Sequence, residues 1–187
     1  MVTTSTSPRL LTVDDFALLG SEADHVELIR GELINMPPTN FEHGEVSGNI
    51  HTRLGMHVLH NQLGTVLSAD TGFTVAHDPD TVLAPDIAFV RADRRPQGRE
   101  RRRFAALAPD LVVEVISPSE TADQVLAKVM AYLEAGVPLV WVVQPVQRAV
   151  TVYTPDRVGR LLSIGDSLDG GDVLPGFSLP IEDVFPP

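Results

Sequence analysis

Apolar residues recur at helical spacing in two long stretches of the chain. In residues 41–61 four of them follow one another at intervals of four positions: Val46, Ile50, Leu54 and Val58. This spacing predicts an amphipathic helix, and it leaves His43 off the apolar stripe. In residues 121–135 the positions with core spacing are Val125, Val129, Tyr132 and Leu133. A second amphipathic helix is therefore expected there.

Shorter apolar runs predict strands between and after these helices. The runs VELI and ELINM flank Arg30 and Gly31 and indicate a hairpin. TVLSA, GFTVA and VLAPDIAFV follow the first long helix and indicate an antiparallel meander of three strands. LVVEVI and LVWVV are apolar almost throughout, as in strands that are buried on both faces. AVTVY and residues 161–164 add further hairpin strands near the C-terminal end.

The order of these elements predicts the fold class. A short helix, with Thr12 as N-cap and Asp15 three positions later, precedes the first hairpin. The chain then alternates long helices with strands, which is typical of an α/β or α+β sandwich around a mixed sheet flanked by helices. At 187 residues it is long enough for one such core. We expect a disordered tail at residues 1–8 and a single domain at residues 9–187.

Composition excludes several kinds of chemistry. The chain has no cysteine, so disulfides, thiolate metal sites and thiol nucleophiles are absent. Its first residues lack the pattern of a secretory signal, and its apolar runs are too short to span a bilayer. A soluble cytoplasmic protein is the expectation.

Charge is distributed unevenly along the chain. The formal net charge is -11, which argues against a surface that binds nucleic acid everywhere. Residues 91–103 nevertheless hold seven arginines against Asp93 and Glu100, a local net charge of +5. Within this segment Arg101, Arg102 and Arg103 are candidates for contact with nucleic-acid phosphates. The alternative is a solvated loop whose charges contact nothing.

Two acidic residues interrupt apolar runs. Asp86 follows Pro85 inside VLAPDIAFV, and Glu114 stands inside LVVEVI. A buried, unpaired carboxylate is unfavourable by several kcal/mol, so each of these acids needs a cation or a hydrogen-bond network. One Mg²⁺ ion would satisfy both, since Mg²⁺ prefers carboxylates, water and phosphate oxygens. Each acid alone is better explained by a strand end that faces solvent or pairs with arginine, and it is the two together with Lys128 that favour a metal site.

One basic residue differs from all the others. Of the 14 basic residues, only Lys128 is a lysine. Arginine replaces a catalytic lysine poorly, because its planar guanidinium stays protonated and cannot act as a compact point charge. Lys128 stands on the helix that follows the Glu114 strand, so that it can lean over the same sheet. The alternative is a lysine that remains by chance on an exposed helix face.

Several strings together resemble a known family. They are VELIRGELINMPP, FEHGEV, APDIAFV, PDLVVEVISPS and LVWVVQP, with Lys128, Tyr132 and Gly136 spaced between the last two. In these strings the chain resembles the Uma-two family of restriction endonuclease-like proteins, within the PD-(D/E)XK nuclease superfamily. The resemblance extends from Val13 to Phe185, and its most specific part is PDLVVEVISPS followed by Lys128.

The resemblance implies a restriction-endonuclease-like fold and a metal-dependent endonuclease. It makes Asp86 the acid of the PD element and Glu114 the second acid, and these two would hold Mg²⁺ (or Mn²⁺) together with the Val115 carbonyl. Lys128 would orient or deprotonate the attacking water. The third position of the motif is Ile116 here, and the lysine comes from the next helix. The family usually has an Asp where this chain has Gln124, which leaves the role of that position open.

Accessory residues and other functions stay open at this point. Glu27 and His43 are outer candidates for the site, each with a structural alternative, and Asp110 is either a metal ligand or the polar start of its strand. The expected substrate is nucleic acid, with DNA favoured over RNA, and a homodimer is plausible. The alternatives are a catalytically inactive binding module with a nuclease fold and a Mg²⁺-dependent hydrolase of smaller phosphate esters.

Overall fold

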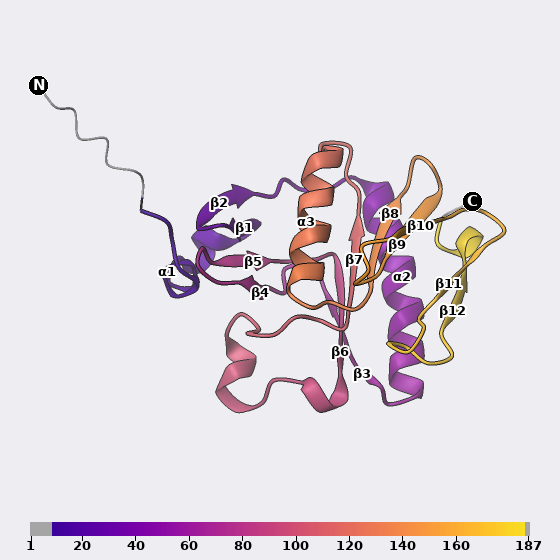
Figure 1. Ribbon diagram of the computed structural model, residues 1–187, viewed down its shortest axis with the longest axis horizontal. Helices are drawn as coiled ribbons and strands as arrows, with labels where there is room; N and C mark the ends of the chain where they lie inside the picture. Colours follow the sequence, from indigo (N-terminus) through magenta and orange to yellow (C-terminus); the bar gives the residue numbers. More distant parts are fainter. Residues whose placement is uncertain (1–8, 186–187) are drawn as a thin grey trace, which may run out of the picture.

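The computed structural model describes residues 9–185, which form two main sheets and a small C-terminal hairpin (Figure 1). The larger sheet has the strand order β10-β9-β8-β7-β6-β3, and its strands are β3 (Gly64–Ser68), β6 (Ile87–Arg91), β7 (Leu111–Val115), β8 (Val140–Gln144), β9 (Ala149–Tyr153) and β10 (Gly159–Leu162). Strands β7 and β8 are parallel and the other neighbours are antiparallel, so the sheet is mixed. The predicted tail at residues 1–8 lies outside the described residues.

The second sheet has four short strands, in the order β2-β1-β5-β4. Its strands are β1 (Val26–Ile29), β2 (Glu32–Asn35), β4 (Phe73–Ala76) and β5 (Thr81–Leu83). Strands β11 (Ser167–Asp169) and β12 (Ser178–Pro180) pair near the C-terminal end. The helices are α1 (Val13–Leu18), α2 (Phe41–His60) and α3 (Ala122–Glu134), with short 3-10 turns at Gly20–Ala23, Ala92–Arg94, Gly98–Arg102 and Ile181–Asp183.

Alternate residues of the large sheet belong to two different cores. Side chains such as Val113 and Trp141 pack with the apolar stripe of α2 and with the C-terminal segment. Their neighbours, such as Val112 and Val142, pack with α3 and with β4 and β5 of the smaller sheet. Figure 1 accordingly shows α3 and the four-stranded sheet on one side of the large sheet, and α2 with β11 and β12 on the other. The predicted class, a mixed sheet flanked by helices with extra C-terminal strands, is confirmed.

Helix α2 follows the predicted spacing, with one correction. Its four stripe residues are at most 1 % exposed, and Asn40 caps its first turn by accepting a hydrogen bond from the His43 amide at 2.9 Å. The prediction that His43 lies off the apolar stripe is wrong. His43 precedes Val46 by three positions, so it shares the buried face of the helix and is only 6 % exposed.

The run VLAPDIAFV is the second correction. It forms two strands in different sheets, because the chain leaves β5 at Ala84 and enters β6 at Ile87. Of the three predicted meander strands, β3 pairs with β6, whereas β4 pairs with β5. Pro85 cannot donate a hydrogen bond to a neighbouring strand, which favours a break there. The break places Asp86 between the two sheets.

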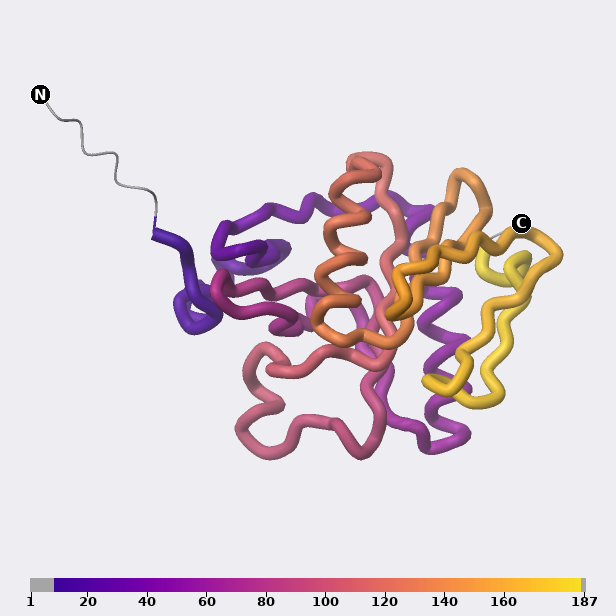
Figure 2. The backbone as a smooth tube through the Cα atoms, viewed as in Figure 1, coloured from indigo at the N-terminus to yellow at the C-terminus, as the bar shows by residue number. Residues whose placement is uncertain are grey.

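The ends of the described chain lie far apart. Figure 2 shows the N-terminal end of the described chain on the side of the four-stranded sheet and the C-terminal end on the opposite side, next to the segment of β11 and β12. Leu174, Phe177 and Phe185 anchor the C-terminal segment, since each is at most 5 % exposed. Among the helices of residues 9–185, none is long and apolar enough to cross a membrane.

Candidate active site

Asp86 stands where strands β6 and β7 cease to pair. The last paired residues are Ile87 and Val113, so the next positions along the two strands are Asp86 and Glu114. Asp86 Oδ2 accepts a hydrogen bond from the backbone amide of Val115 at 2.8 Å. A side chain thus replaces the backbone partner that a longer β6 would supply, and the carboxylate is held against the end of β7.

Glu114 lies inside the protein and faces α3. Its side chain is 10 % exposed, and its Oε1 atom accepts a hydrogen bond from the Tyr132 hydroxyl at 2.7 Å. Burial raises the pKa of the Glu114 carboxyl to about 8, and the charges of Asp86 and Glu27 act in the same direction against the lowering by Lys128. Burial and the two neighbouring carboxylates therefore outweigh the stabilisation that Lys128 gives to the ionised carboxylate.

Lys128 extends from α3 into a group of three carboxylates. Its Nζ atom lies 3.2 Å from Glu27 Oε2 and 3.8 Å from both Glu114 Oε2 and Glu120 Oε1, and its side chain is 9 % exposed. Burial alone would lower the pKa of Lys128, but the charges of Glu114, Glu27 and Glu120 outweigh it and raise the pKa above its ordinary value. Lys128 therefore stays an ammonium near neutral pH.

Glu27 brings the smaller sheet into this group. It is 1 % exposed on β1, and its Oε1 atom accepts a hydrogen bond from the Ala84 amide at 2.9 Å. Ala84 directly precedes the break that carries Asp86. Glu27, an outer candidate in the sequence, is thus a direct partner of Lys128 in the structure.

His43 approaches the same point from α2. Its Nε2 atom lies 3.3 Å from Asp86 Oδ2, and its Nδ1 atom lies 3.5 Å from Ser47 Oγ. Burial lowers the pKa of His43, but the hydrogen bond and charge of Asp86 and the backbone of Val115 outweigh it, so that the pKa is raised above its ordinary value. The ring is thus fixed beside Asp86, which directly precedes β6, and Val115, which is the last residue of β7.

The donor atoms at this point suit a hard divalent cation. The Ile116 amide donates to Val143, so the backbone groups of Val115 face the other way, toward Asp86. Oxygen donors are therefore available from two carboxylates and one carbonyl. Glu27 and Glu120 bring the carboxyl groups to four, against the single ammonium of Lys128. This deficit of positive charge is what a Mg²⁺ or Mn²⁺ ion would supply.

No group of three His, Asp or Glu side chains is gathered closely enough to hold a metal ion by itself in residues 9–185. This finding is compatible with Mg²⁺, which keeps several waters and usually takes only one or two carboxylates from the protein. The residues thus fit an ion that is bound partly by water and substrate.

A cleft leads from the surface to two of these residues, Glu27 and Asp86. It has a volume of about 770 Å³, and Glu27, Asp86 and Phe104 are among its lining residues. A second hollow of about 520 Å³ lies beside it under the arginine-rich loop, and Asp70, Gly72 and Phe104 line both. Side chains of Arg95, Arg101, Arg102 and Arg103 line the second hollow.

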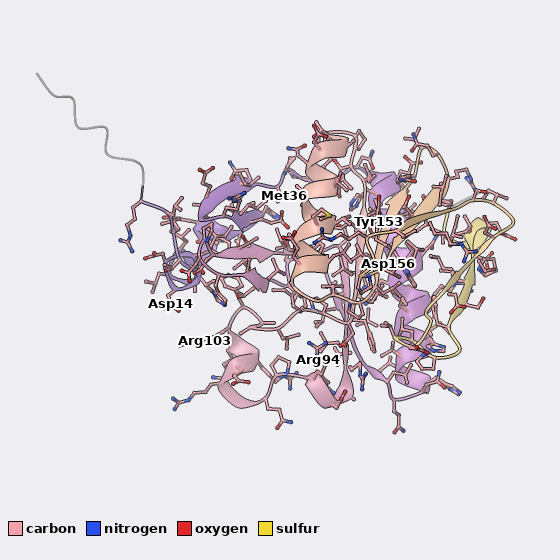
Figure 3. The ribbon with its side chains drawn as sticks, viewed as in Figure 1. Asp14, Met36, Arg94, Arg103, Tyr153 and Asp156 are labelled. Carbon is pink, nitrogen blue, oxygen red and sulfur yellow. The ribbon has the colours of Figure 1, made fainter. Side chains whose placement is uncertain are left out.

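Two residues that the sequence suggested for the site, Gln124 and Asp110, lie outside it, and so does the arginine-rich loop. Gln124 completes a capping box at the start of α3, where its Oε1 atom accepts a hydrogen bond from the Thr121 amide at 2.9 Å. Asp110 accepts hydrogen bonds from the Arg91 amide and from Arg94, at 2.9 and 2.6 Å, and so holds the start of the arginine-rich loop. Arg94 and Arg103, labelled in Figure 3, lie on this loop.

Two residues of the site, Tyr132 and Glu120, are not predicted from the sequence to take part in it. Tyr132 has the spacing of a core residue and is fully buried, but its hydroxyl also donates to Glu114. Its position four residues after Lys128, on the same helix face, is the signal that could have found it. Glu120 folds back onto its own loop, because its Oε2 atom accepts a hydrogen bond from the Ser117 amide at 2.9 Å. No periodicity marks a loop acid of this kind.

Comparisons with known proteins agree with this architecture. A family model described as "Uma2: Putative restriction endonuclease" matches residues 13–182. Among solved structures, "a putative nuclease belonging to DUF820" from Anabaena variabilis superposes with a TM-score of 0.83 at 21% sequence identity, covering 94% of this chain and 97% of that one. No match was found among curated proteins. The structural likeness shows the fold, and the family match shows that the chain belongs to the Uma2 family of restriction-endonuclease-like proteins.

Proposed function

We propose that the protein is a metal-dependent endonuclease that hydrolyses phosphodiester bonds of nucleic acid, with DNA as the expected substrate. The observation that carries the proposal is the assembly of Asp86, Glu114 and Lys128 at one end of β6 and β7, beside a cleft. Asp86 comes from the break between β5 and β6, Glu114 from β7 and Lys128 from α3, and all three side chains are largely buried. Burial of so many charged groups is expected at a site of chemistry.

Asp86, Glu114 and the Val115 carbonyl would hold the metal ion. A bound Mg²⁺ or Mn²⁺ ion would polarise the scissile phosphate and lower the pKa of a bound water. The Val115 amide fixes Asp86, and the Tyr132 hydroxyl fixes Glu114 Oε1. Both carboxylates are thus oriented by hydrogen bonds from groups that do not themselves bind the ion.

Lys128 would act as a positive charge and a hydrogen-bond donor. Because the surrounding carboxylates raise its pKa, it holds its proton and is unsuited to remove one from water. Its ammonium would instead orient the attacking water and stabilise the negative charge that develops on the phosphate oxygens. Glu27 keeps this ammonium in place from the opposite sheet.

The arginine-rich loop supports a polyanionic substrate. Its hollow adjoins the cleft at Phe104, so a polynucleotide whose phosphates contact Arg101, Arg102 and Arg103 could continue toward Asp86. Such contacts position a nucleic acid without reading its bases. We also propose a homodimer, because two such sites would then act on the two strands of a duplex.

The decisive experiment compares cleavage of supercoiled plasmid by the wild type, Asp86→Asn and Asp14→Asn, with Mg²⁺, with Mn²⁺ or with EDTA. The wild type and Asp14→Asn, which changes an exposed acid on α1 (Figure 3), should nick or linearise the plasmid only with a metal ion. The cleavage rate of Asp86→Asn should fall by more than about 10–100-fold, the loss that is typical when a residue supporting a metal ligand is removed.

Two outcomes would contradict the proposal. One is cleavage by Asp86→Asn at the wild-type rate, and the other is wild-type cleavage that persists in EDTA. Binding of plasmid without turnover by a folded wild type, under all three conditions, would instead indicate a binding module. Thermal melts of each variant show whether it is folded.

A further inference from the structure

We propose that the cleft beside Asp86 receives an unpaired base, so that the substrate is single-stranded DNA or an unpaired stretch of a duplex, such as an overhang. This inference rests on the proposed function, because it names the class of nucleic acid on which the same site would act. The arginine-rich loop would hold the phosphates of the same strand.

The lining of the cleft is the first argument. Among the described residues that line it, none is a lysine or an arginine, whereas the carboxylates of Asp24, Asp70 and Asp86 all do. Phe16 and Met36, the latter labelled in Figure 3, are among its apolar side chains. Such a lining repels the phosphates of a nucleic acid, except where a bound metal ion compensates. A flat, uncharged base suits it, since apolar walls with few polar groups are typical of sites for small organic molecules.

The neighbouring hollow has the opposite character. Four side chains of the arginine-rich loop line it, against the two carboxylates of Asp70 and Glu100. The hollow and the cleft share Asp70, Gly72 and Phe104, so one strand can extend from the first into the second. Proteins that bind single strands combine a positive groove for the backbone with apolar, aromatic surfaces for the bases. The two hollows divide these tasks in the same way.

The ring of Phe104 lies at the boundary of the two hollows and is held in place. It stacks on Phe16 with the ring centroids 5.0 Å apart. A Cβ atom at Gly72 would lie only 2.5 Å from Phe104 Cδ1, so glycine lets the ring approach the backbone there. The Ala105 amide donates to the Gly72 carbonyl and the Ala105 carbonyl accepts from the Thr74 amide, both at 2.9 Å. The half-buried ring is thus positioned before substrate binds, which reduces the entropy lost on binding.

The size of the cleft favours an unpaired base over an intact duplex. Its volume of about 770 Å³ lies within the about 300–1,000 Å³ that is typical of pockets for one small organic molecule. The side chain of Asp86, which lines it, is only 19 % exposed. A base of an intact duplex is stacked and paired, and it reaches such a recess only after it has been extruded. An unpaired base enters without that cost.

The test measures the binding of labelled DNA in EDTA, by fluorescence anisotropy, for a single strand and for a blunt duplex of the same sequence. The proteins are the wild type, Ala69→Trp, Phe104→Ala and Ala127→Trp. Ala69 is exposed and lines the cleft, so that tryptophan there should fill the cleft without disturbing the core. Ala127→Trp is the matched control, because Ala127 is exposed on α3 and lines neither hollow.

The measured quantity is the ratio of the affinity for the single strand to the affinity for the duplex. Ala69→Trp and Phe104→Ala should lower this ratio by about 5-fold or more, the effect of losing one contact between a base and an aromatic surface. Ala127→Trp should leave it unchanged. Thermal melts show whether Phe104→Ala is folded, and Ala69→Trp carries the comparison if it is not. A ratio that folded Ala69→Trp leaves unchanged, or that Ala127→Trp lowers equally, would overturn the inference.

Cleavage of the same DNA with Mg²⁺ separates this inference from the proposed function. The wild type should cut the single strand and an overhang faster than the blunt duplex, and a supercoiled plasmid stays a substrate because its supercoiling favours local unpairing. Cleavage of the blunt duplex as fast as of the single strand would overturn this inference and leave the nuclease. A lowered ratio in Ala69→Trp, with no cleavage by the wild type, would support the cleft as a site for a base and overturn the nuclease.

Discussion

Lys128 is a single ammonium among three carboxylates, two of them buried, and its removal should affect stability and activity separately. Lys128→Met would leave Glu27 and Glu114 without their cation. We expect a loss of about 3–5 kcal/mol in the free energy of unfolding, because an unpaired buried charge remains. Cleavage should fall by about 10²–10³-fold, as when one charge-stabilising donor is removed. Urea denaturation and plasmid cleavage measure the two effects.

The double variant Glu27→Gln/Lys128→Met is the control for this prediction. It removes one of the unpaired carboxylates, so it should recover part of the stability but none of the cleavage. Lys128→Arg keeps the charge and should also cut poorly, since a guanidinium is longer and planar. Equal cleavage by wild type and Lys128→Arg would show that the position of the ammonium does not matter.

The raised pKa of Glu114 predicts how stability depends on pH when no metal ion is present. Its ordinary pKa is 4.5, whereas burial raises it to about 8 in the folded protein. Between these values the folded protein binds a proton that the unfolded chain releases, so the contribution of Glu114 to stability is lost as the pH rises to about 8. Glu114→Gln cannot titrate at this position.

Thermal melts in EDTA at pH 5, 7 and 9 test this. The melting temperature of the wild type should fall relative to that of Glu114→Gln as the pH rises, because all other groups titrate in both proteins. Parallel curves for the two proteins would mean that Glu114 is already ionised when folded at pH 5.

At this scale the sequence singles out some site residues and conceals others. Asp86 and Glu114 break apolar runs, and Lys128 is the only lysine, so each contrasts with its surroundings. Tyr132 does not stand out from its neighbours, because a tyrosine on the apolar face of a helix is typical of an ordinary core. Glu27 alternates with apolar neighbours like any strand-surface acid, and only the docking of the two sheets buries it.

At the scale of single elements, the capping box of α3 explains Gln124. Thr121 and Gln124 exchange hydrogen bonds at the start of the helix that carries Lys128. Thr121→Ala should therefore reduce stability by about 1 kcal/mol. Gln124→Ala should act in the same direction, and neither variant should change the affinity for Mn²⁺. Urea denaturation and metal titration measure the two quantities. A lower Mn²⁺ affinity of folded Gln124→Ala would show that Gln124 contributes to metal binding.

Local patterns predict most elements but not every pairing between them. The helices and the first hairpin depend on neighbours within a few residues, and the structure confirms them. Strand partners depend on contacts far apart along the chain. VLAPDIAFV therefore looks like one strand, although its two halves join different sheets. For the same reason, local patterns do not predict that the chain breaks between two strands at Asp86.

At the scale of the whole molecule, the arginine-rich loop is a positive region on a negatively charged protein. If Arg101, Arg102 and Arg103 contact phosphates, changing all three to alanine should weaken binding similarly for unrelated DNA sequences. The dependence of log affinity on log salt should become shallower by about one unit for each phosphate that is no longer neutralised. Fluorescence anisotropy of labelled duplexes, over a series of salt concentrations in EDTA, measures both.

A matched charge control distinguishes local contact from a general change of charge. Arg53, Arg157 and Arg160 are exposed, and their triple alanine variant changes the net charge by the same amount. It should leave the salt dependence close to that of the wild type. If both triple variants change the slope equally, the loop has no special contact with the substrate.

The site lies where the two sheets meet, and this has a consequence for the cell that makes the protein. Glu27 comes from an early strand, whereas Lys128 comes from a helix about a hundred residues later, and their ion pair forms only after both sheets have docked. A chain that has not yet made α3, or one that has opened between the sheets, lacks the ion pair that holds Lys128 in place. If the protein cuts DNA as proposed, such immature or damaged copies should cut more slowly than the folded protein.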